Sequence, residues 1–235
     1  MADQGLKIDQ LDPLPLPVLA TDDLVVGRSG DLKRMAVRHF RGGISNRKGD
    51  LVPPQAANFP TWVNQSATTV TDLPDGFRFE RLTALTGDSL SGVVRPLHAG
   101  AWDVKLCCVR GWMLKNWLIG GLWLRESSTG KIVTWGFGHQ NNADFVVRWN
   151  SPTSFHSILK SGYERPLKIW LRAKLVGTSI EFHRSPDGVY WSLFYVIEQT
   201  APFTVAPDQW GAFINANNNA APQLPMRMDV LDWSE

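Results

Sequence analysis

Short runs of alternating hydrophobic and polar residues, separated by turn residues, recur along the chain from about residue 60 onward. The run 102–109 has an apolar residue at every other position, which is typical of a strand with one buried face. Further strands are expected at 77–82, 118–125, 131–137, 145–149, 167–176, 179–184, 189–198, 210–216 and 226–233. No long amphipathic helix interrupts them. The pattern predicts an all-β fold, an antiparallel two-sheet jelly-roll sandwich.

Two of the connections carry clear turn chemistry. Glu-Ser-Ser-Thr-Gly at 126–130 predicts a hairpin, and Ser-Pro-Asp-Gly at 185–188 predicts a turn inside an antiparallel meander. That meander is expected to contain the strands 145–149, 167–176, 179–184 and 189–198. Alternation in its last strand predicts one apolar face made of Val189, Trp191, Leu193, Tyr195 and Ile197, with Phe194 facing the other way. Of the 11 tryptophans, we expect these in the core: Trp102, Trp149, Trp191 and Trp233.

The first 40 residues differ from the rest of the chain. Prolines at 13, 15 and 17 exclude a regular helix or central strand, and 22–37 holds two short β-prone runs around a glycine-containing turn. A hairpin alone is marginal in water, so we expect it to gain stability from another chain. The expected organisation is an arm and hairpin at 1–40, a linker at 41–58 and the sandwich at 59–235.

Composition excludes several classes of function. With 24 Lys and Arg against 22 Asp and Glu, the net charge of +2 gives no global field to hold nucleic acid. The longest apolar run, 117–124, is too short to span a membrane, and the first residues do not form a secretory signal. The two cysteines, 107 and 108, are neighbours and provide no disulfide framework, which fits synthesis in a reducing compartment.

Several segments of the predicted sandwich carry a family resemblance. Ser-Pro-Asp-Gly-Val-Tyr-Trp at 185–191 and Gly-Leu-Trp-Leu-Arg-Glu-Ser-Ser-Thr-Gly-Lys at 121–131 resemble motifs of concanavalin A-like (laminin-G-like) domains. The segments 170–174, 180–184, 211–217 and 228–231 are similar to other strands of that family. The resemblance covers roughly residues 60–235 and implies the same jelly roll.

The N-terminal segment has a resemblance of its own. Residues 7–13, 21–26 and 33–37 are similar to the leader of tailed-bacteriophage fibre, head-fibre and decoration proteins, although a proline-rich 14–17 replaces the more usual alanine-rich sequence. The resemblance implies a virion structural protein, made in the host cytoplasm and anchored to other virion proteins of the capsid, collar or tail platform. The implied anchoring residues are Ile8, Leu11, Asp22, Leu24, Val26, Arg34 and Val37. We expect a homotrimer, because such an arm would be stabilised by symmetric partners.

Catalytic chemistry is not evident. A glycosidase needs two carboxylates at a set separation, and no strand carries such a pair, so Asp103, Glu126 and Glu181 are expected to be solvated surface residues. The five histidines lack metal-ligand spacing, and no nucleotide-binding or nucleophile motif occurs. We therefore expect a protein that is not an enzyme and uses no cofactor or metal.

Aromatic and amide residues in three predicted loops suggest an alternative, a glycan-binding module for host attachment. Aromatic rings stack on the apolar faces of sugars, and amides form hydrogen bonds with sugar hydroxyls. The candidate glycan-binding residues are Trp112, Lys115, Asn116, Trp117, His139, Asn141, Asn142, Asn215 and Asn217. A purely structural role stays open as well, with the tryptophans in the core and the asparagines in turns. A glycoside hydrolase or depolymerase is the third possibility.

Overall fold

The computed structural model describes residues 23–28, 31–36, 53–82, 87–111, 118–138, 143–163, 167–217 and 226–235, the first two ranges as backbone only. The chain divides into two compact units, Met1–Asn46 and Arg47–Glu235. In the first unit, β1 (Asp23–Arg28) and β2 (Asp31–Ala36) pair antiparallel, so the predicted hairpin is present. Leu24, Val26 and Arg34 lie on these strands. The other predicted anchoring positions, Ile8, Leu11, Asp22 and Val37, lie outside the described residues.

The second unit is an all-β sandwich of two antiparallel seven-stranded sheets, as the sequence predicts. We call the first the pocket sheet. Its strands, in spatial order, are β11 (Ser154–Tyr163), β10 (Ala143–Ser151), β9 (Ile132–Gly138), β8 (Leu118–Arg125), β15 (Gln209–Ala216), β6 (Leu90–Pro96) and β3 (Thr61–Val63). The second is the opposite sheet. Its order is β14 (Ser192–Glu198), β13 (Ser179–Ser185), β12 (Lys168–Val176), β7 (Asp103–Arg110), β16 (Met226–Ser234), β5 (Gly76–Arg81) and β4 (Thr69–Leu73).

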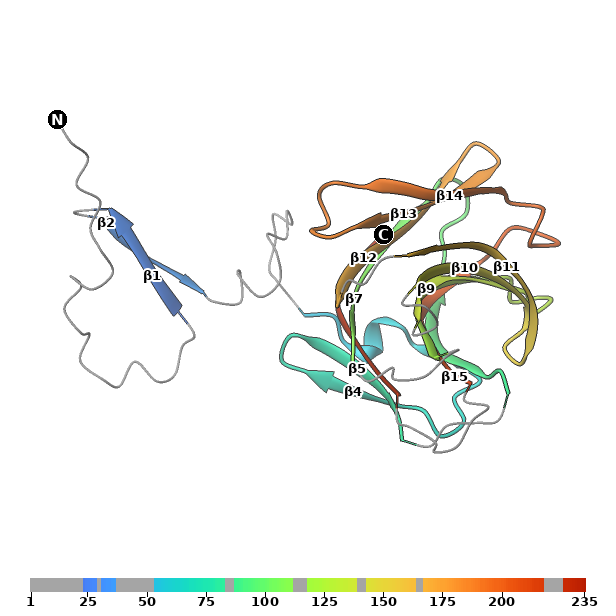
Figure 1. Cartoon of the computed structure of the whole chain (residues 1–235), viewed down its shortest axis with the longest axis horizontal. Coiled ribbons are helices and arrows are strands. Elements are labelled where there is room, and N and C mark those ends of the chain that lie inside the picture. The colour runs from blue at the N-terminus through green and yellow to red at the C-terminus, as the bar shows by residue number, and fades with distance from the viewer. Residues whose placement is uncertain are drawn as a thin grey trace. The chain divides into compact units, whose positions relative to one another are not determined.

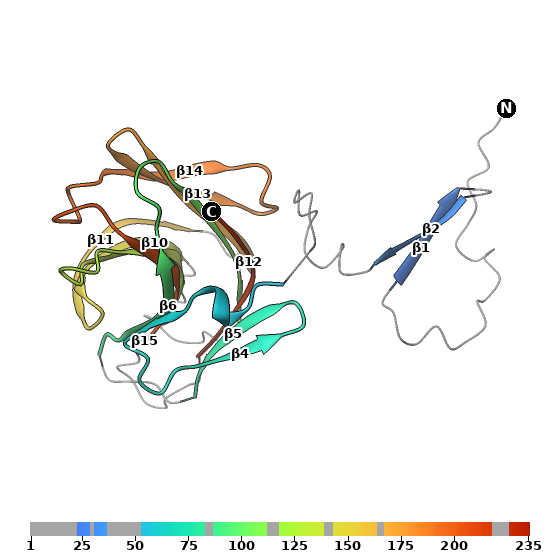
Figure 2. The ribbon, with the colours of Figure 1, turned by 180° about the vertical axis from the view of Figure 1, so that it is seen from behind.

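Strands that are distant in the sequence lie side by side in both sheets. β15 pairs with β6 on one side and β8 on the other, while β16 lies between β5 and β7. These crossed connections give the jelly-roll topology. Figures 1 and 2 show the pocket sheet curling through β9, β10 and β11 into an arc, which leaves a concave face on the side away from the opposite sheet. A short 3₁₀ helix, Ala56–Asn58, precedes β3.

The main core fills the space between the sheets. It contains buried side chains of both, such as Leu122 of β8 and Leu106 of β7, and it includes Phe59 just ahead of β3. Polar contacts also join the two sheets: for example, the fully buried Trp135 of β9 donates its indole N–H to the carbonyl oxygen of His183 on β13 at 2.9 Å. Buried polar groups cost free energy unless they are paired, so such bonds hold the two sheets in register.

The turn predicted at 185–188 forms through its own side chains. Ser185 Oγ accepts the N–H of Gly188 at 2.8 Å, and Asp187 Oδ1 accepts the N–H groups of Val189 and Tyr190 at 2.8 and 3.0 Å. Gly188 has a φ of +79°, a conformation that favours glycine. The turn at 126–130 is also confirmed, here by a backbone hydrogen bond in which the Gly130 N–H donates to the Glu126 carbonyl oxygen at 2.9 Å.

Several elements differ from the prediction. β3, β4, β6 and β11 were not expected. β10, which overlaps the predicted strand 145–149, belongs to the pocket sheet, so the meander contains only β12, β13 and β14. Turn signals mark where a chain reverses, but they do not say whether it returns to the same sheet.

The alternation predicted for 189–198 holds at Tyr195 and Ile197, which pack against the main core, but it is wrong at Leu193 and Phe194. The pairing of β13 with β14 shifts register between Phe182 and His183, so that these two residues lie opposite Tyr195 and Leu193. The bulge leaves Phe194 packed against the core beside Tyr195, whereas Leu193 is 56% exposed. One extra residue in a strand reverses the faces of the side chains beyond it.

Burial corrects two other predictions. Trp102 and Trp149 are buried, and Trp233 packs against the main core although it is only partly buried, as Trp191 is. Glu126 is not a solvated surface residue, because it is 1% exposed. Its carboxylate accepts the backbone N–H of Thr204 at 2.7 Å and the hydroxyl of Ser128 at 3.2 Å, which explains how a charge is tolerated there.

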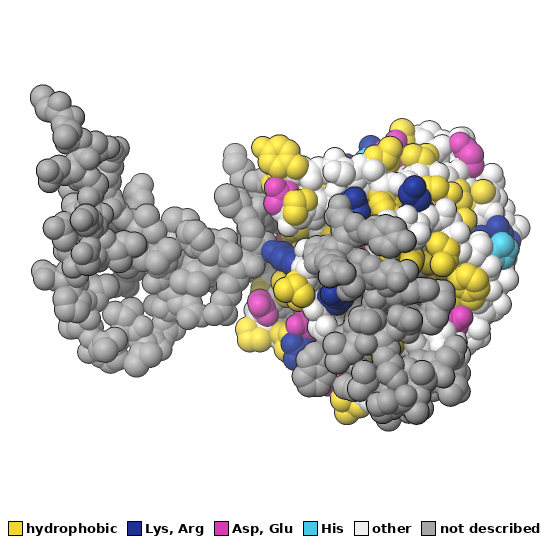
Figure 3. All heavy atoms as spheres, in the orientation of Figure 1, with side chains coloured by type: hydrophobic (Ala, Val, Ile, Leu, Met, Phe, Trp, Pro, Cys, Tyr) yellow, Lys and Arg dark blue, Asp and Glu magenta, His cyan; other side chains and the backbone are white. Residues whose placement is uncertain are grey.

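The surface fits the near-neutral charge. Figure 3 shows the described Lys and Arg side chains on the face turned to the viewer interspersed with Asp, Glu and hydrophobic ones, and these described side chains form no continuous basic stripe. Within the described ranges, no helix is long and apolar enough to cross a membrane.

Candidate functional site

A second cluster of buried hydrophobic residues lies on the concave face of the pocket sheet. Alternation along the strands creates it, since every other residue of β8, β9, β10 and β15 points away from the main core. Its members are Val63, Leu90, Val94, Ile119, Trp123, Ile132, Ala143, Phe145, Val147, Trp149 and Phe213. Both faces of the pocket sheet are therefore apolar, whereas a sheet with one solvated face would carry polar residues there.

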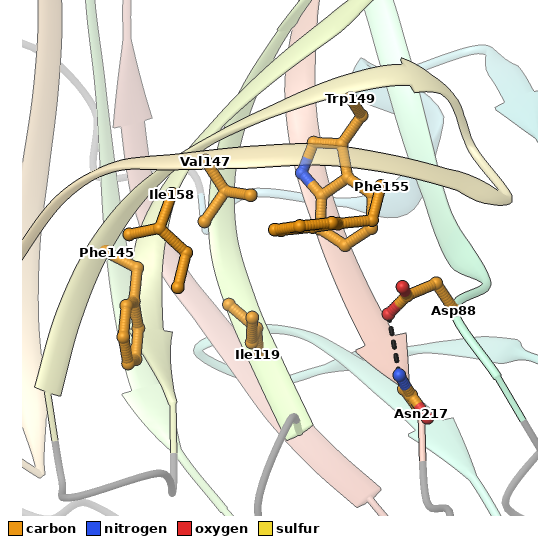
Figure 4. A pocket seen from close by; sticks show the side chains of 8 residues that line it. All are labelled: Asp88, Ile119, Phe145, Val147, Trp149, Phe155, Ile158 and Asn217. Carbon is orange, nitrogen blue, oxygen red and sulfur yellow. Dashed lines mark hydrogen bonds between the residues drawn. The ribbon is translucent and has the colours of Figure 1, made fainter.

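Part of this face is hollowed into a pocket of about 280 Å³. Among the described residues, it is lined by Asp88, Ile119, Phe145, Val147, Trp149, Phe155, Ile158 and Asn217. Figure 4 shows the hydrophobic side chains, most of them from β10 and β11, on one side and the pair formed by Asp88 and Asn217 on the other. The pocket thus has a broad apolar wall and a small polar end.

Two aromatic rings form much of the wall. Trp149 and Phe155 meet edge to face with their ring centroids 5.5 Å apart. The indole N–H of Trp149 donates to Thr134 Oγ1 at 3.0 Å, which fixes the ring. Phe155 is 43% exposed and Ile158 is 40% exposed, and both lie on β11 at the edge of the sheet. These two side chains are the part of the wall most accessible from solvent.

The polar end is a carboxylate held by two amides. Asp88 Oδ1 accepts hydrogen bonds from the side-chain N–H₂ groups of Asn217 at 2.7 Å and Asn215 at 3.1 Å. The orientation of Asn215 is fixed in turn, because its Oδ1 accepts the backbone N–H of Ser89 at 3.0 Å. Asp88 Oδ2 accepts no hydrogen bond from the described residues, so it is the oxygen left to bind a donor.

The structure places only two of the predicted glycan-binding residues, Asn215 and Asn217, among the described residues. Trp112, Lys115, Asn116, Trp117, His139, Asn141 and Asn142 lie outside the described residues. Asn217 lines the pocket and is 6% exposed. Asn215 was expected in a loop but lies on β15, fully buried. Because its amide is committed to Asp88 and Ser89, it supports the pocket instead of facing a ligand.

The sequence interpretation missed most of the pocket. Asp88 stands in a connection with no motif, and β11 was not predicted, so Phe155 and Ile158 were not considered. A usable signal existed in β10, where Phe145, Val146 and Val147 are consecutive apolar residues. Such a run indicates a strand buried on both faces, and hence a second apolar region beyond the main core.

Two of the carboxylates expected at the surface form ion pairs away from the pocket. Asp103 pairs with Arg172 and Glu181 pairs with Lys174, in both cases on the opposite sheet. Asp88 is the one carboxylate that lines the pocket among the described residues. In that part of the chain, no group of three or more His, Cys, Asp or Glu side chains could hold a metal ion.

Comparisons with known proteins identify the fold. No family model matches the sequence, and a search of curated proteins also finds no match. A protein of unknown function from Saccharomyces cerevisiae is similar over 74% of this chain and 94% of its own, with a TM-score of 0.51 and 14% identity. A bifunctional GH43-CE protein of Bacteroides eggerthii matches 80% of this chain with a TM-score of 0.51 and 13% identity, and this chain covers 26% of that protein.

A third structure is the carbohydrate-binding module CBM66 from Bacillus subtilis, which matches 74% of this chain and 95% of its own. Its TM-score is 0.43 at 12% identity. The two matches with a TM-score of 0.51 agree with the sandwich seen here, and at these identities they show the fold alone. The chain is thus an all-β, antiparallel two-sheet jelly-roll sandwich, and a small β-hairpin unit precedes it in the sequence.

Proposed function

We propose that the protein binds a carbohydrate in the pocket of its concave sheet. The observation that carries this proposal is the juxtaposition of a fixed carboxylate, Asp88, with an aromatic wall formed by Trp149 and Phe155. A sugar ring has an apolar face suited to the wall and hydroxyl groups that can donate to Asp88 Oδ2. The aromatic rings supply contact area, and the carboxylate sets the orientation.

Binding without cleavage is the second part of the proposal. Glycoside hydrolysis needs two carboxyl groups on either side of the scissile bond, about 5 to 9.5 Å apart. Asp88 stands alone among the described pocket residues. The segments 83–86, 112–117, 139–142 and 218–225, which adjoin pocket strands in the sequence, contain no Asp or Glu. The absence of reducing-sugar release from bound polysaccharides would support this, and release that depends on Asp88 would contradict it.

A glycan array followed by titration calorimetry tests the binding proposal. Asp88→Asn and Phe155→Ala should each weaken binding at least about tenfold, because they remove the acceptor and the accessible part of the wall. Trp117→Ala and Asn141→Ala test the candidate residues predicted from the sequence on the same array.

Two variants outside the pocket serve as matched controls. Asp75→Asn changes an exposed carboxylate in the turn between β4 and β5, and Tyr190→Ala removes an aromatic ring that is 77% exposed. Both should bind as the unaltered chain does. If no glycan binds, or if Asp88→Asn and Asp75→Asn behave alike, the pocket does not have this function.

We also propose that the N-terminal unit attaches the glycan-binding sandwich to a larger assembly, as in a phage virion appendage. The support is the separate hairpin unit, Met1–Asn46, whose strands match the segment that resembles virion leaders. A two-stranded hairpin is too small to be stable alone. Co-purification of the full chain with virions from a producing host would test this, and its absence from virions would contradict it.

A further inference from the structure

We propose that the pocket selects a single 6-deoxyhexose, the neutral sugar whose C6 is a methyl group, at the end of a glycan chain. This inference rests on the proposed carbohydrate binding and names the class of sugar. Three properties of the pocket lead to it: its volume, the chemistry of its wall and the sign of the charge on Asp88.

The volume favours one sugar ring. At about 280 Å³, the pocket lies at the lower end of the range for small-molecule sites, roughly 300 to 1,000 Å³. An extended oligosaccharide would need a longer groove. The two half-exposed side chains, Phe155 and Ile158, mark the accessible rim, from which the rest of a glycan could continue into solvent.

The wall favours a methyl group over a hydroxymethyl group. Ile119, Val147 and Ile158 offer only carbon atoms, and Phe145 lies beside them. The indole N–H of Trp149 is already bonded to Thr134. A C6 hydroxyl placed against this wall would lose its water without gaining a partner, which is costly. A methyl group at the same position gains apolar contact instead. An N-acetyl group would bring an unpaired amide to the same wall.

The charge excludes acidic sugars. Asp88 is the one charged side chain that lines the pocket among the described residues, and its two fixed partners are neutral amides. A uronic or sialic acid would place a second carboxylate near it, and the described lining residues include no cation to offset the two charges. Like charges at close range in a partly apolar site repel strongly. Sugar hydroxyls, in contrast, can donate to Asp88 Oδ2.

Calorimetric titration of the full chain with three matched methyl glycosides tests the inference. 6-Deoxygalactose, galactose and galacturonic acid share one ring configuration and differ only at C6, and the corresponding manno series repeats the comparison. The 6-deoxy sugar should bind at least about tenfold more tightly than its parent hexose, and the uronic acid should not bind measurably.

A pair of variants places the preference in the pocket. Ile158→Ser adds a hydroxyl group to the wall. It should reduce the ratio of the affinity for the deoxy sugar to the affinity for the hexose severalfold. Val196→Ser is the control, because Val196 is similarly exposed, at 43%, but lies on β14 at the edge of the opposite sheet. This substitution should leave the affinity ratio unchanged. If hexose or uronic acid binds as tightly as the deoxy sugar, this inference is overturned while carbohydrate binding stands. If no glycan of any class binds, the proposed function fails and the inference fails with it.

Discussion

Individual charged residues on the opposite sheet are arranged as ion pairs between neighbouring strands. Arg172 on β12 lies opposite Lys105 on β7, and its guanidinium donates to both carboxylate oxygens of Asp103, with Nε to Oδ1 at 2.7 Å. Burial alone would raise the pKa of Asp103, but the hydrogen bond from Arg172 and the charge of Lys105 outweigh it and lower that pKa. The carboxylate is thus stabilised in its charged form by the folded state.

This lowered pKa predicts a pH-dependent stability. A carboxyl group whose pKa is lower in the folded state stabilises the fold above its unfolded pKa of about 4. That contribution is lost as the pH falls from about 4 through the folded pKa. Asp103→Asn should therefore lower the free energy of unfolding at about pH 7 by roughly 1 kcal/mol or less, since the pair is partly exposed. Urea unfolding at about pH 7 and pH 2.5 measures the difference, which should shrink at the acidic value.

Asp75→Asn is the control for this measurement, because Asp75 is exposed in a turn. It should change neither the stability nor its dependence on pH by more than about 0.5 kcal/mol. A stability loss for Asp103→Asn that persists undiminished at about pH 2.5 would show that the substitution acts through packing and not through the ion pair.

At the scale of elements, the bulge in β14 decides which side chains close the end of the main core. Phe194 stacks on Trp135 with ring centroids 4.5 Å apart, and the Arg184 guanidinium lies 5.2 Å from its ring. Leu193, the preceding residue on the same strand, is 56% exposed. A strand without the bulge would reverse these roles.

The bulge predicts unequal effects of two neighbouring substitutions. Phe194→Ala should lower the free energy of unfolding by about 2 kcal/mol, because it removes a half-buried ring from the core. Leu193→Ala should cost less than about 0.5 kcal/mol. Urea unfolding of both variants measures the difference. Equal losses, or a larger loss for Leu193→Ala, would mean that the regular alternation is right and the bulge is absent.

The same strand shows which features of the fold could be predicted from the sequence. Period-two patterns and the Ser-Pro-Asp-Gly turn predict the existence of strands and the sandwich class correctly, because both depend on local chemistry. They do not reveal the bulge, since one inserted residue is compatible with an equally apolar pattern. They also missed β11, whose Ser, His and Lys residues lack the apolar alternation of an interior strand and fit an edge.

The pocket was less predictable than the fold for a physical reason. Asp88 and Asn217 are 129 residues apart in the chain and meet only because β15 pairs with β6. Asn217 was a candidate on the basis of its residue type, whereas nothing local to Asp88 marks it. Trp149 was correctly expected to be buried, yet its ring lies on the concave face, because a buried residue in a doubly apolar sheet can belong to either side.

At the scale of the whole molecule, the two units differ in how they are stabilised. The sandwich has a core between its sheets and a second apolar cluster on one face, which suffice for a domain of this size. The described residues of the hairpin unit form two six-residue strands, and a two-stranded hairpin by itself is at best marginally stable in water. Contacts with identical hairpins of other copies would add stability, and the homotrimer expected from the sequence stays a prediction.

The trimer is tested by sedimentation equilibrium of the full chain at micromolar concentration. We expect a mass three times that of the 26.3 kDa chain. Leu24 and Val26 share one face of β1, so the double substitution Leu24→Asp with Val26→Asp should yield monomers by placing charges in the contact. The near-UV circular dichroism of the tryptophan-rich sandwich serves as the control and should not change. A monomeric unaltered chain would contradict the trimer, and a trimeric double variant would show that the contact lies outside this face.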